Sequence, residues 1–106
     1  MAVGAAFLAK IKLAAGITAS IFDTDITDLI ESARSEMIRT GVDPAIAASE
    51  TDALVRLAIR TKIQSEYAEN EAEAVRLAAS FASQSAALSM STRYRAESSE
   101  VVVYEV

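Results

Sequence analysis

Hydrophobic and polar residues alternate along most of this chain with the period of an α-helix. The pattern is clearest in the second quarter of the chain, where the apolar positions share one helical face: Ile26, Leu29, Ile30, Ala33 and Met37. Asp23 or Thr24 can cap the start of this helix, and Gly41 is a residue type that commonly ends one. The spacing therefore predicts an amphipathic helix between these residues.

Helical segments are also predicted on either side of this helix. A first helix from about Val3 to Ala15 meets Gly16, which is typical of a helix end. Beyond Gly41, Asp43 followed by a proline favours a cap and a first-turn proline, which predicts a helical turn over residues 44–48.

Two longer helices complete the predicted domain. The segment from about Glu50 to Ala68 is apolar on more than one face, which is typical of a central helix. The segment from about Glu71 to Met90 follows Asn70, a favourable cap, and carries a looser apolar stripe among alanines and serines. The expected fold is mainly α, a small four-helix domain over residues 1–96. The residues that we expect in its core include Leu29, Ile30, Leu54 and Ile59.

The last ten residues differ from the rest of the chain. Residues 97–100 are polar, and the β-branched and aromatic residues that follow them favour an extended strand. A lone strand needs a partner edge, so we expect residues 97–106 to be an extended C-terminal β-strand tail that binds another protein. The edge can belong to another protein, to a neighbouring subunit or to its own domain. The partner-binding residues expected here are Val101, Val102, Val103, Tyr104 and Val106.

Net charge changes the list of partners. The chain carries −5 at pH 7, which disfavours general attraction to nucleic-acid phosphates or to an anionic membrane. Six carboxylates and two arginines give residues 23–43 a charge of −4, whereas Arg93 and Arg95 form a basic stretch. These two regions can meet on neighbouring subunits, or both can be solvated faces, because exposed ion pairs contribute little.

Candidate chemistry is sparse. The chain has no cysteine and no histidine, which excludes disulfides, thiolate metal sites and the commonest general base. The group of Asp23, Asp25 and Asp28 lacks the glycine and terminal glutamate of a calcium loop, so helix capping explains it better. Tyr94 between two arginines can stack on a base, but one such cluster in an acidic protein is weak support for nucleic-acid binding. We predict no catalytic, cofactor or metal site.

The N-terminal segment does not predict export or membrane insertion. The apolar residues 2–8 precede Lys10 and Lys12, whereas a signal peptide has its positive residues first. No apolar run reaches the roughly 18–20 residues of a membrane span. We expect a soluble protein that is made inside the cell.

Three segments together resemble the phage head–tail connector, or adaptor, family. Lys10-Ile11-Lys12-Leu13-Ala14-Ala15-Gly16-Ile17 is similar to its opening helix and Gly-Ile stop, and Asp25-Ile26-Thr27-Asp28-Leu29-Ile30-Glu31-Ser32-Ala33 to its next helix. The helix from Asp52 to Tyr67, with Ala53-Leu54-Val55-Arg56-Leu57-Ala58-Ile59, is similar to its buried central helix. The resemblance covers about residues 8–90.

This resemblance implies a structural virion protein rather than an enzyme, with no catalytic residues. It implies a homo-oligomeric ring beneath the portal that extends the DNA channel and joins head to tail. The implied partners are the portal protein and tail-side connector or stopper proteins, with double-stranded DNA passing through without specific binding and no membrane. The protein would be made in the host cytoplasm and act in the virion.

In such a ring, the channel-lining candidates are Asp25, Asp28 and Glu31, because carboxylates repel DNA phosphates. Lys10 and Lys12 are the alternative inward-facing residues. The alternative function is a small helical regulatory or DNA-associated module, which would usually be a dimer, whereas a connector would be a large ring or a monomer that assembles only on its partner. An enzyme of unknown type is a third and weaker option.

Overall fold

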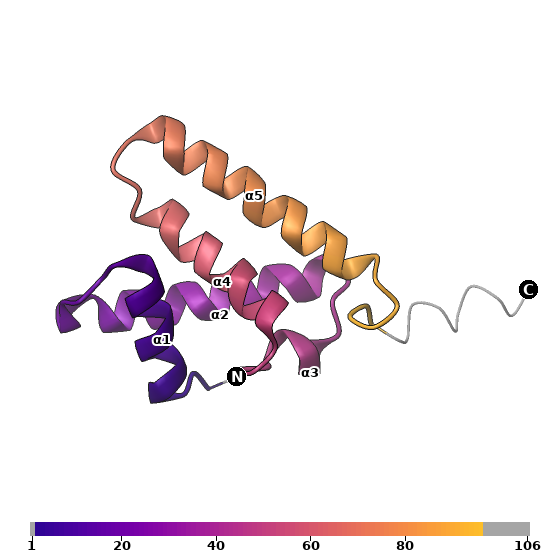
Figure 1. Cartoon of the computed structure of the whole chain (residues 1–106). Coiled ribbons are helices and arrows are strands. Elements are labelled where there is room, and N and C mark those ends of the chain that lie inside the picture. The colour runs from indigo at the N-terminus through magenta and orange to yellow at the C-terminus, as the bar shows by residue number, and fades with distance from the viewer. Residues whose placement is uncertain (1, 97–106) are drawn as a thin grey trace, which may run out of the picture.

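The computed structural model describes residues 2–96 and is helical throughout (Figure 1). Its elements are α1 (Ala5–Ala15), the 3-10 turn η1 (Ser20–Phe22), α2 (Asp23–Thr40), α3 (Pro44–Ala47), α4 (Ala53–Glu66) and α5 (Glu71–Ser89). The mainly α prediction is confirmed. The count of four helices is wrong by one, because the predicted turn after Asp43 forms the short helix α3. The predicted tail, residues 97–106, lies outside the described residues.

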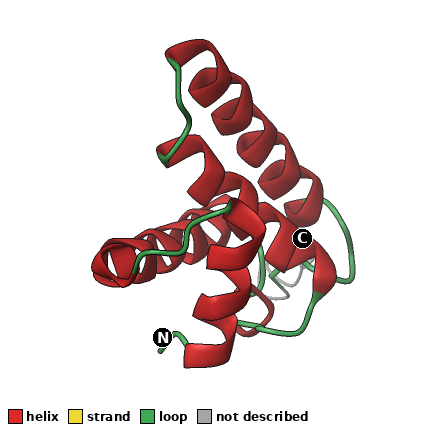
Figure 2. Ribbon diagram, turned by 60° about the vertical axis from the view of Figure 1, so that its left-hand side comes forward, coloured by secondary structure: helices red, strands yellow, loops and turns green. Residues whose placement is uncertain are grey.

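The helices form a small bundle with one long hairpin. α4 and α5 run side by side in opposite directions, and α2 packs against both (Figures 1 and 2). α1 lies against α4 and α2, while α3 packs on α2. The described residues measure 53 × 31 × 19 Å, so the bundle is longer than it is thick.

Local residue chemistry explains where most of these helices begin and end. Gly16 and Gly41 have φ values of 77° and 118° and end α1 and α2, as predicted. The Asp43 carboxylate accepts a hydrogen bond from the Ile46 N–H at 3.2 Å, and the Asn70 side chain accepts one from the Glu73 N–H at 2.8 Å. The predicted caps of α3 and α5 are therefore confirmed.

The start of α2 differs from the prediction. Asp23 is already inside the helix, Phe22 occupies the cap position, and no side chain caps the helix there. The reason is η1, the turn that precedes α2 and leads directly into it. Asp23 instead accepts a hydrogen bond from Lys12 of α1 at 2.5 Å, which ties the two helices together.

The core lies where α1, α2 and α4 meet, with contributions from α5. The buried hydrophobic residues include Phe7, Ile11, Ile26, Ile30, Met37, Val55, Ile59, Ile63, Phe81 and Leu88. Burial of Ile30 and Ile59 is confirmed, and Leu29 is half-buried against the core. Burial of Leu54 is wrong, because this side chain is 50% exposed. It shares a face of α4 with the buried Ala58, Thr61 and Ser65, but as the second residue of the helix it lies at the end of that face, where the cover stops.

Arg34 is the largest fully buried side chain in the described structure. Its guanidinium donates to the Ala2 carbonyl at 3.1 Å and to Glu50 Oε2 at 3.3 Å, and it lies 5.5 Å from the centre of the Phe7 ring. Glu50 Oε2 also accepts a hydrogen bond from the Gly4 N–H at 2.8 Å. This cluster fixes the chain before α1 against α2 and against the loop that precedes α4.

Candidate interaction surfaces

The structure brings the three channel-lining candidates together on one face of α2. Asp25, Asp28 and Glu31 are all exposed and recur every three residues. This face lies opposite the buried stripe that contains Ile26 and Ile30, so it points away from the bundle. Within residues 2–96, none of the three carboxylates has an ion-pair partner.

The alternative lysines differ from each other. Lys12 is bound to Asp23, and only 14% of its side chain is exposed, so its charge is already used within the bundle. Lys10 is exposed and has no ion-pair partner among the described residues. Of the two lysines that the sequence suggested as inward-facing residues, only Lys10 has a charge that no described carboxylate neutralises.

The end of the described chain is tied to the α2–α3 connection. The Asp43 N–H donates to the Tyr94 carbonyl at 2.8 Å, and the Ala96 N–H donates to the Gly41 carbonyl at 2.7 Å. Val42 and Arg95 form an antiparallel bridge between these hydrogen bonds. The chain therefore enters residues 97–106 from a fixed point beside α3.

Tyr94 is part of this fixed point. Its ring is buried, and its hydroxyl donates to the Asp52 carboxylate at 3.0 Å. Asp52 also caps α4, because Oδ1 accepts hydrogen bonds from the Leu54 and Val55 N–H groups, both at 3.0 Å. The base-stacking interpretation of Tyr94 is therefore wrong, since its ring packs in the core and its hydroxyl holds a helix cap.

The hydrogen bond shifts both pKa values. For Asp52, burial acts to raise the pKa, but hydrogen bonds from the Val55 N–H, the Tyr94 hydroxyl and the Leu54 N–H outweigh it, with a further contribution from the charge of Arg93. The result is a pKa below 3.8. For Tyr94, burial, the hydrogen bond to Asp52 and the Asp52 charge raise the pKa above 10.0, against the charge of Arg93. The pair is thus a neutral donor on a charged acceptor at neutral pH.

The other predicted partner-binding residues lie at the same end. Arg93 is exposed, and its guanidinium lies 5.4 Å from the centre of the Tyr94 ring. Arg95 is half-buried in the bridge with Val42. The structure thus places both arginines next to the start of the tail, and their partner-binding role stays a prediction. The tail residues Val101, Val102, Val103, Tyr104 and Val106 lie outside the described residues.

Two roles were missed by the sequence reasoning. Arg34 is fully buried and bonded to Glu50, a role that the spacing of residues in the second helix did not predict. Asp52 caps α4 and also holds the Tyr94 hydroxyl, and this second contact was not predicted. The Arg34–Glu50 and Asp52–Tyr94 contacts join residues that are 16 and 42 positions apart, which helical periodicity does not report.

No metal-binding group and no membrane span is found in the part of the chain that the structure describes. Residues 2–96 contain no cluster of three or more Asp or Glu side chains placed to hold a metal ion. No single described helix is long and apolar enough to cross a membrane. α1 and residues 20–40 are long and apolar enough only when they are taken together, and the two segments are bent by 116° relative to each other.

The fold is a small helical bundle. Its distinctive surface features are the acidic face of α2 and the chain end that is held at the α2–α3 connection. A family model described as phage connector protein matches residues 7–95. The chain therefore belongs to the phage connector protein family, as the three sequence segments indicated. No curated protein and no solved structure matches the chain. The family is structural rather than catalytic. Membership in this phage family implies that the chain is a component of a virion.

Proposed function

We propose that this chain is a head–tail connector that forms a ring of identical subunits beneath the portal. The ring extends the DNA channel and joins the head to tail-side connector or stopper proteins. The observation that carries the proposal is the match to the phage connector protein family over residues 7–95.

In this ring, the acidic face of α2 lines the channel. Asp25, Asp28 and Glu31 are exposed on one side of the helix, where their charges repel DNA phosphates and let the duplex slide. The duplex therefore passes through without a specific contact. Purified protein that binds duplex DNA tightly and loses that binding with added salt would contradict this part of the proposal.

The C-terminal tail makes the contact with the portal. The hydrogen bonds of residues 94 and 96 hold the chain at the α2–α3 connection, so the tail leaves from a defined place. Along an extended strand, Val101 and Val103 share one side and Val102 and Tyr104 the other, which gives two largely apolar sides. Pairing with an exposed sheet edge of the portal buries both sides and satisfies the backbone.

The experiment is a deletion of residues 97–106 from the chain. The truncated protein is expected to keep the helicity and melting temperature of the full chain and to lose attachment to portal-bearing heads. Attachment is measured by co-sedimentation with heads and by electron microscopy of the portal vertex. The matched control, Ser98→Ala with Ser99→Ala, keeps the tail length and its apolar residues, and should attach as the full chain does.

Two results would overturn the proposal. A truncated chain that unfolds would show that the tail belongs to its own domain. A full chain that does not bind portal-bearing heads under any salt condition would remove the connector role itself.

A further inference from the structure

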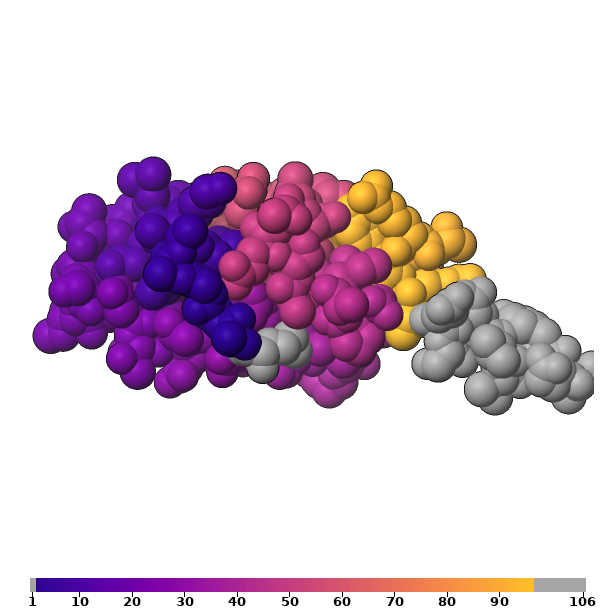
Figure 3. Space-filling view, turned by 90° about the horizontal axis from the view of Figure 1, so that it is seen from below, coloured from indigo at the N-terminus to yellow at the C-terminus, as the bar shows by residue number. Residues whose placement is uncertain are grey.

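A groove between α1 and α4 carries three cations. It has a volume of about 470 Å³, and Lys10, Arg56 and Arg60 line it together with the apolar side chains of Ile11 and Leu57. Figure 3 shows α1 and the start of α4 lying side by side on the face seen from below. None of the described residues that line this groove, which we call the α1–α4 groove, is a carboxylate.

The cations of the groove are unpaired in the described structure. Lys12, Lys62, Arg34, Arg39 and Arg76 all have a carboxylate within 4.0 Å. Residues 2–96 supply no such partner to any of the three groove cations, and the buried Arg60 Nε has no hydrogen-bond partner there. A buried donor without an acceptor is costly, so the groove is suited to an acidic occupant.

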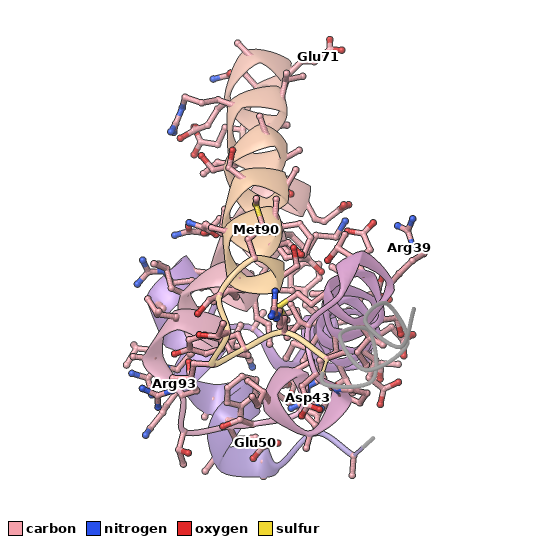
Figure 4. All side chains as sticks on the ribbon, turned by 90° about the vertical axis from the view of Figure 1, so that its right-hand side faces the viewer. Arg39, Asp43, Glu50, Glu71, Met90 and Arg93 are labelled. Atoms are coloured by element: carbon pink, nitrogen blue, oxygen red, sulfur yellow. The ribbon has the colours of Figure 1, made fainter. Side chains whose placement is uncertain are left out.

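An acidic surface of matching charge lies at the end of the α4–α5 hairpin. Glu69 and Glu71 are both exposed, and neither has an ion-pair partner within residues 2–96. Figure 4 shows Glu71 at the far end of the hairpin, well away from Glu50 and Asp43. We call residues 69–71 the hairpin tip.

A chain cannot place its tip in its own groove. Arg56 and Glu66 lie on the same helix, α4, and ten residues of α-helix separate them by about 15 Å. The tip follows Glu66, so its distance from the groove is fixed by that rigid helix. A hairpin tip that occupies the groove must therefore belong to another copy of the chain.

We propose that the hairpin tip of one copy docks in the α1–α4 groove of the next copy, an inference that rests on the proposed ring. Each copy gives its tip to one neighbour and receives a tip from the other. Such a head-to-tail contact closes into a ring when the rotation between copies allows it. Exposed ion pairs are weak and screened by salt, so the contact is expected to be strongest at low salt.

Charge swaps test the contact. Arg56→Glu with Arg60→Glu, or Glu69→Arg with Glu71→Arg, should each weaken self-association at least tenfold in sedimentation velocity at low salt. All four substitutions in one chain have the net charge of the wild type and should restore self-association. An equal mixture of the two double variants should also co-assemble, because each tip then meets a groove of opposite charge. Double variants that associate like the wild type would overturn the proposal.

Cysteine cross-linking tests the geometry, and the absence of native cysteines leaves no background. Ala14→Cys in the groove wall and Ala72→Cys beside the tip are both exposed positions. The double variant should oxidise at high protein concentration to a ladder of species larger than dimers. The control is Ala45→Cys with Ala72→Cys, in which the first cysteine lies at an exposed position of α3 outside the groove. This control should not form the ladder. Dimers alone, or no excess over the control, would contradict the proposal.

The other occupant of a cationic groove is DNA. Duplex DNA binding that is lost in the Arg56→Glu, Arg60→Glu variant would assign the groove to phosphate and overturn the contact between copies. The failure of this inference is distinguishable from failure of the connector role. If the double variants still attach to portal-bearing heads as complete rings, the role stands and another surface joins the copies.

Discussion

α2 and the first half of α5 differ in how many of their side chains are buried. In α2, five residues are buried: Ile26, Ile30, Ala33, Arg34 and Met37. In α5, only Phe81, Ser85 and Leu88 are buried, and its first ten residues, 71–80, contain none. We call residues 71–80 the outer half of α5, and the part formed by α1, α2, α3 and the start of α4 the body.

The contrast shows that a helix can form where none of its side chains is fully buried. The outer half of α5 has Asn70 as a cap, two acidic residues in its first turn and several alanines, all of which favour helix by themselves. The body instead depends on packing and on buried hydrogen bonds such as that of Arg34. The body therefore maintains the fold, and the outer half leaves its surface available for assembly.

The largest expected effect is the removal of a core side chain from the body. Ile59→Ala should cost about 2–5 kcal/mol of unfolding free energy, because it leaves a cavity in a fully buried site. Leu54→Ala, on the same helix and 50% exposed, should cost less than about 1 kcal/mol. Urea denaturation of the two variants measures the difference. Equal losses would show that the first turn of α4 is covered as well as its middle.

A smaller loss is expected from the buried arginine. Arg34→Met keeps much of the apolar stem but removes the donor of the Ala2 carbonyl and one of the two donors of Glu50, at a cost of about 1–3 kcal/mol. The same measurement on Arg39→Met, an exposed arginine of α2, supplies the control and should show almost no loss. If Arg34→Met is as stable as the control, the cluster is not part of what maintains the body.

The Asp52–Tyr94 hydrogen bond makes the stability of the fold depend on pH. The pKa of Asp52 is lowered in the fold, so its contribution is present above pH 3.8 and is lost as the pH falls through the folded pKa. The pKa of Tyr94 is raised, so its contribution is present below pH 10.0 and is lost as the pH rises through the folded pKa.

Tyr94→Phe should therefore be less stable than the wild type between these limits, with the difference shrinking below pH 3.8 and above pH 10.0. Melting temperatures of both proteins across the range measure it. Tyr67→Phe, a tyrosine with no hydrogen-bonded carboxylate in the described structure, is the control below pH 10.0, because burial and the charges of Asp25 and Glu66 raise the pKa of Tyr67 as well. A difference that is constant through pH 11 would contradict the assigned hydrogen bond.

The smallest effect on stability is expected in the outer half of α5. Val75 is 62% exposed, so Val75→Ser should change the unfolding free energy by less than about 0.5 kcal/mol. Denaturation by urea is again the measurement. A loss above 1 kcal/mol would show that this segment has a core of its own.

Much of the fold follows from short-range residue chemistry. The left-handed glycines at 16 and 41 and the caps Asp43 and Asn70 act within one helical turn, so the sequence alone predicted them. The start of α2 was misplaced because η1 extends the helical path backwards. Leu54 was misassigned because periodicity predicts the buried face of α4, whereas packing decides how far along the helix that face is covered.

The surfaces were less predictable than the helices. The acidic face of α2 was predicted because Asp25, Asp28 and Glu31 repeat at helical spacing. The α1–α4 groove was not, because Lys10 and Arg56 lie 46 residues apart and meet only when α1 packs on α4. Likewise, Tyr94 and Asp52 join distant parts of the chain.

Hydrogen exchange of backbone amides, measured in the free chain and in assembled particles, tests the division between body and outer half most directly. In the free chain, amides of α2 should exchange only by global unfolding, whereas residues 71–80 should exchange by local opening. On assembly, residues 71–80 should become at least tenfold slower, while α2 changes little. Equal protection of both segments in the free chain, with no change on assembly, would contradict the account.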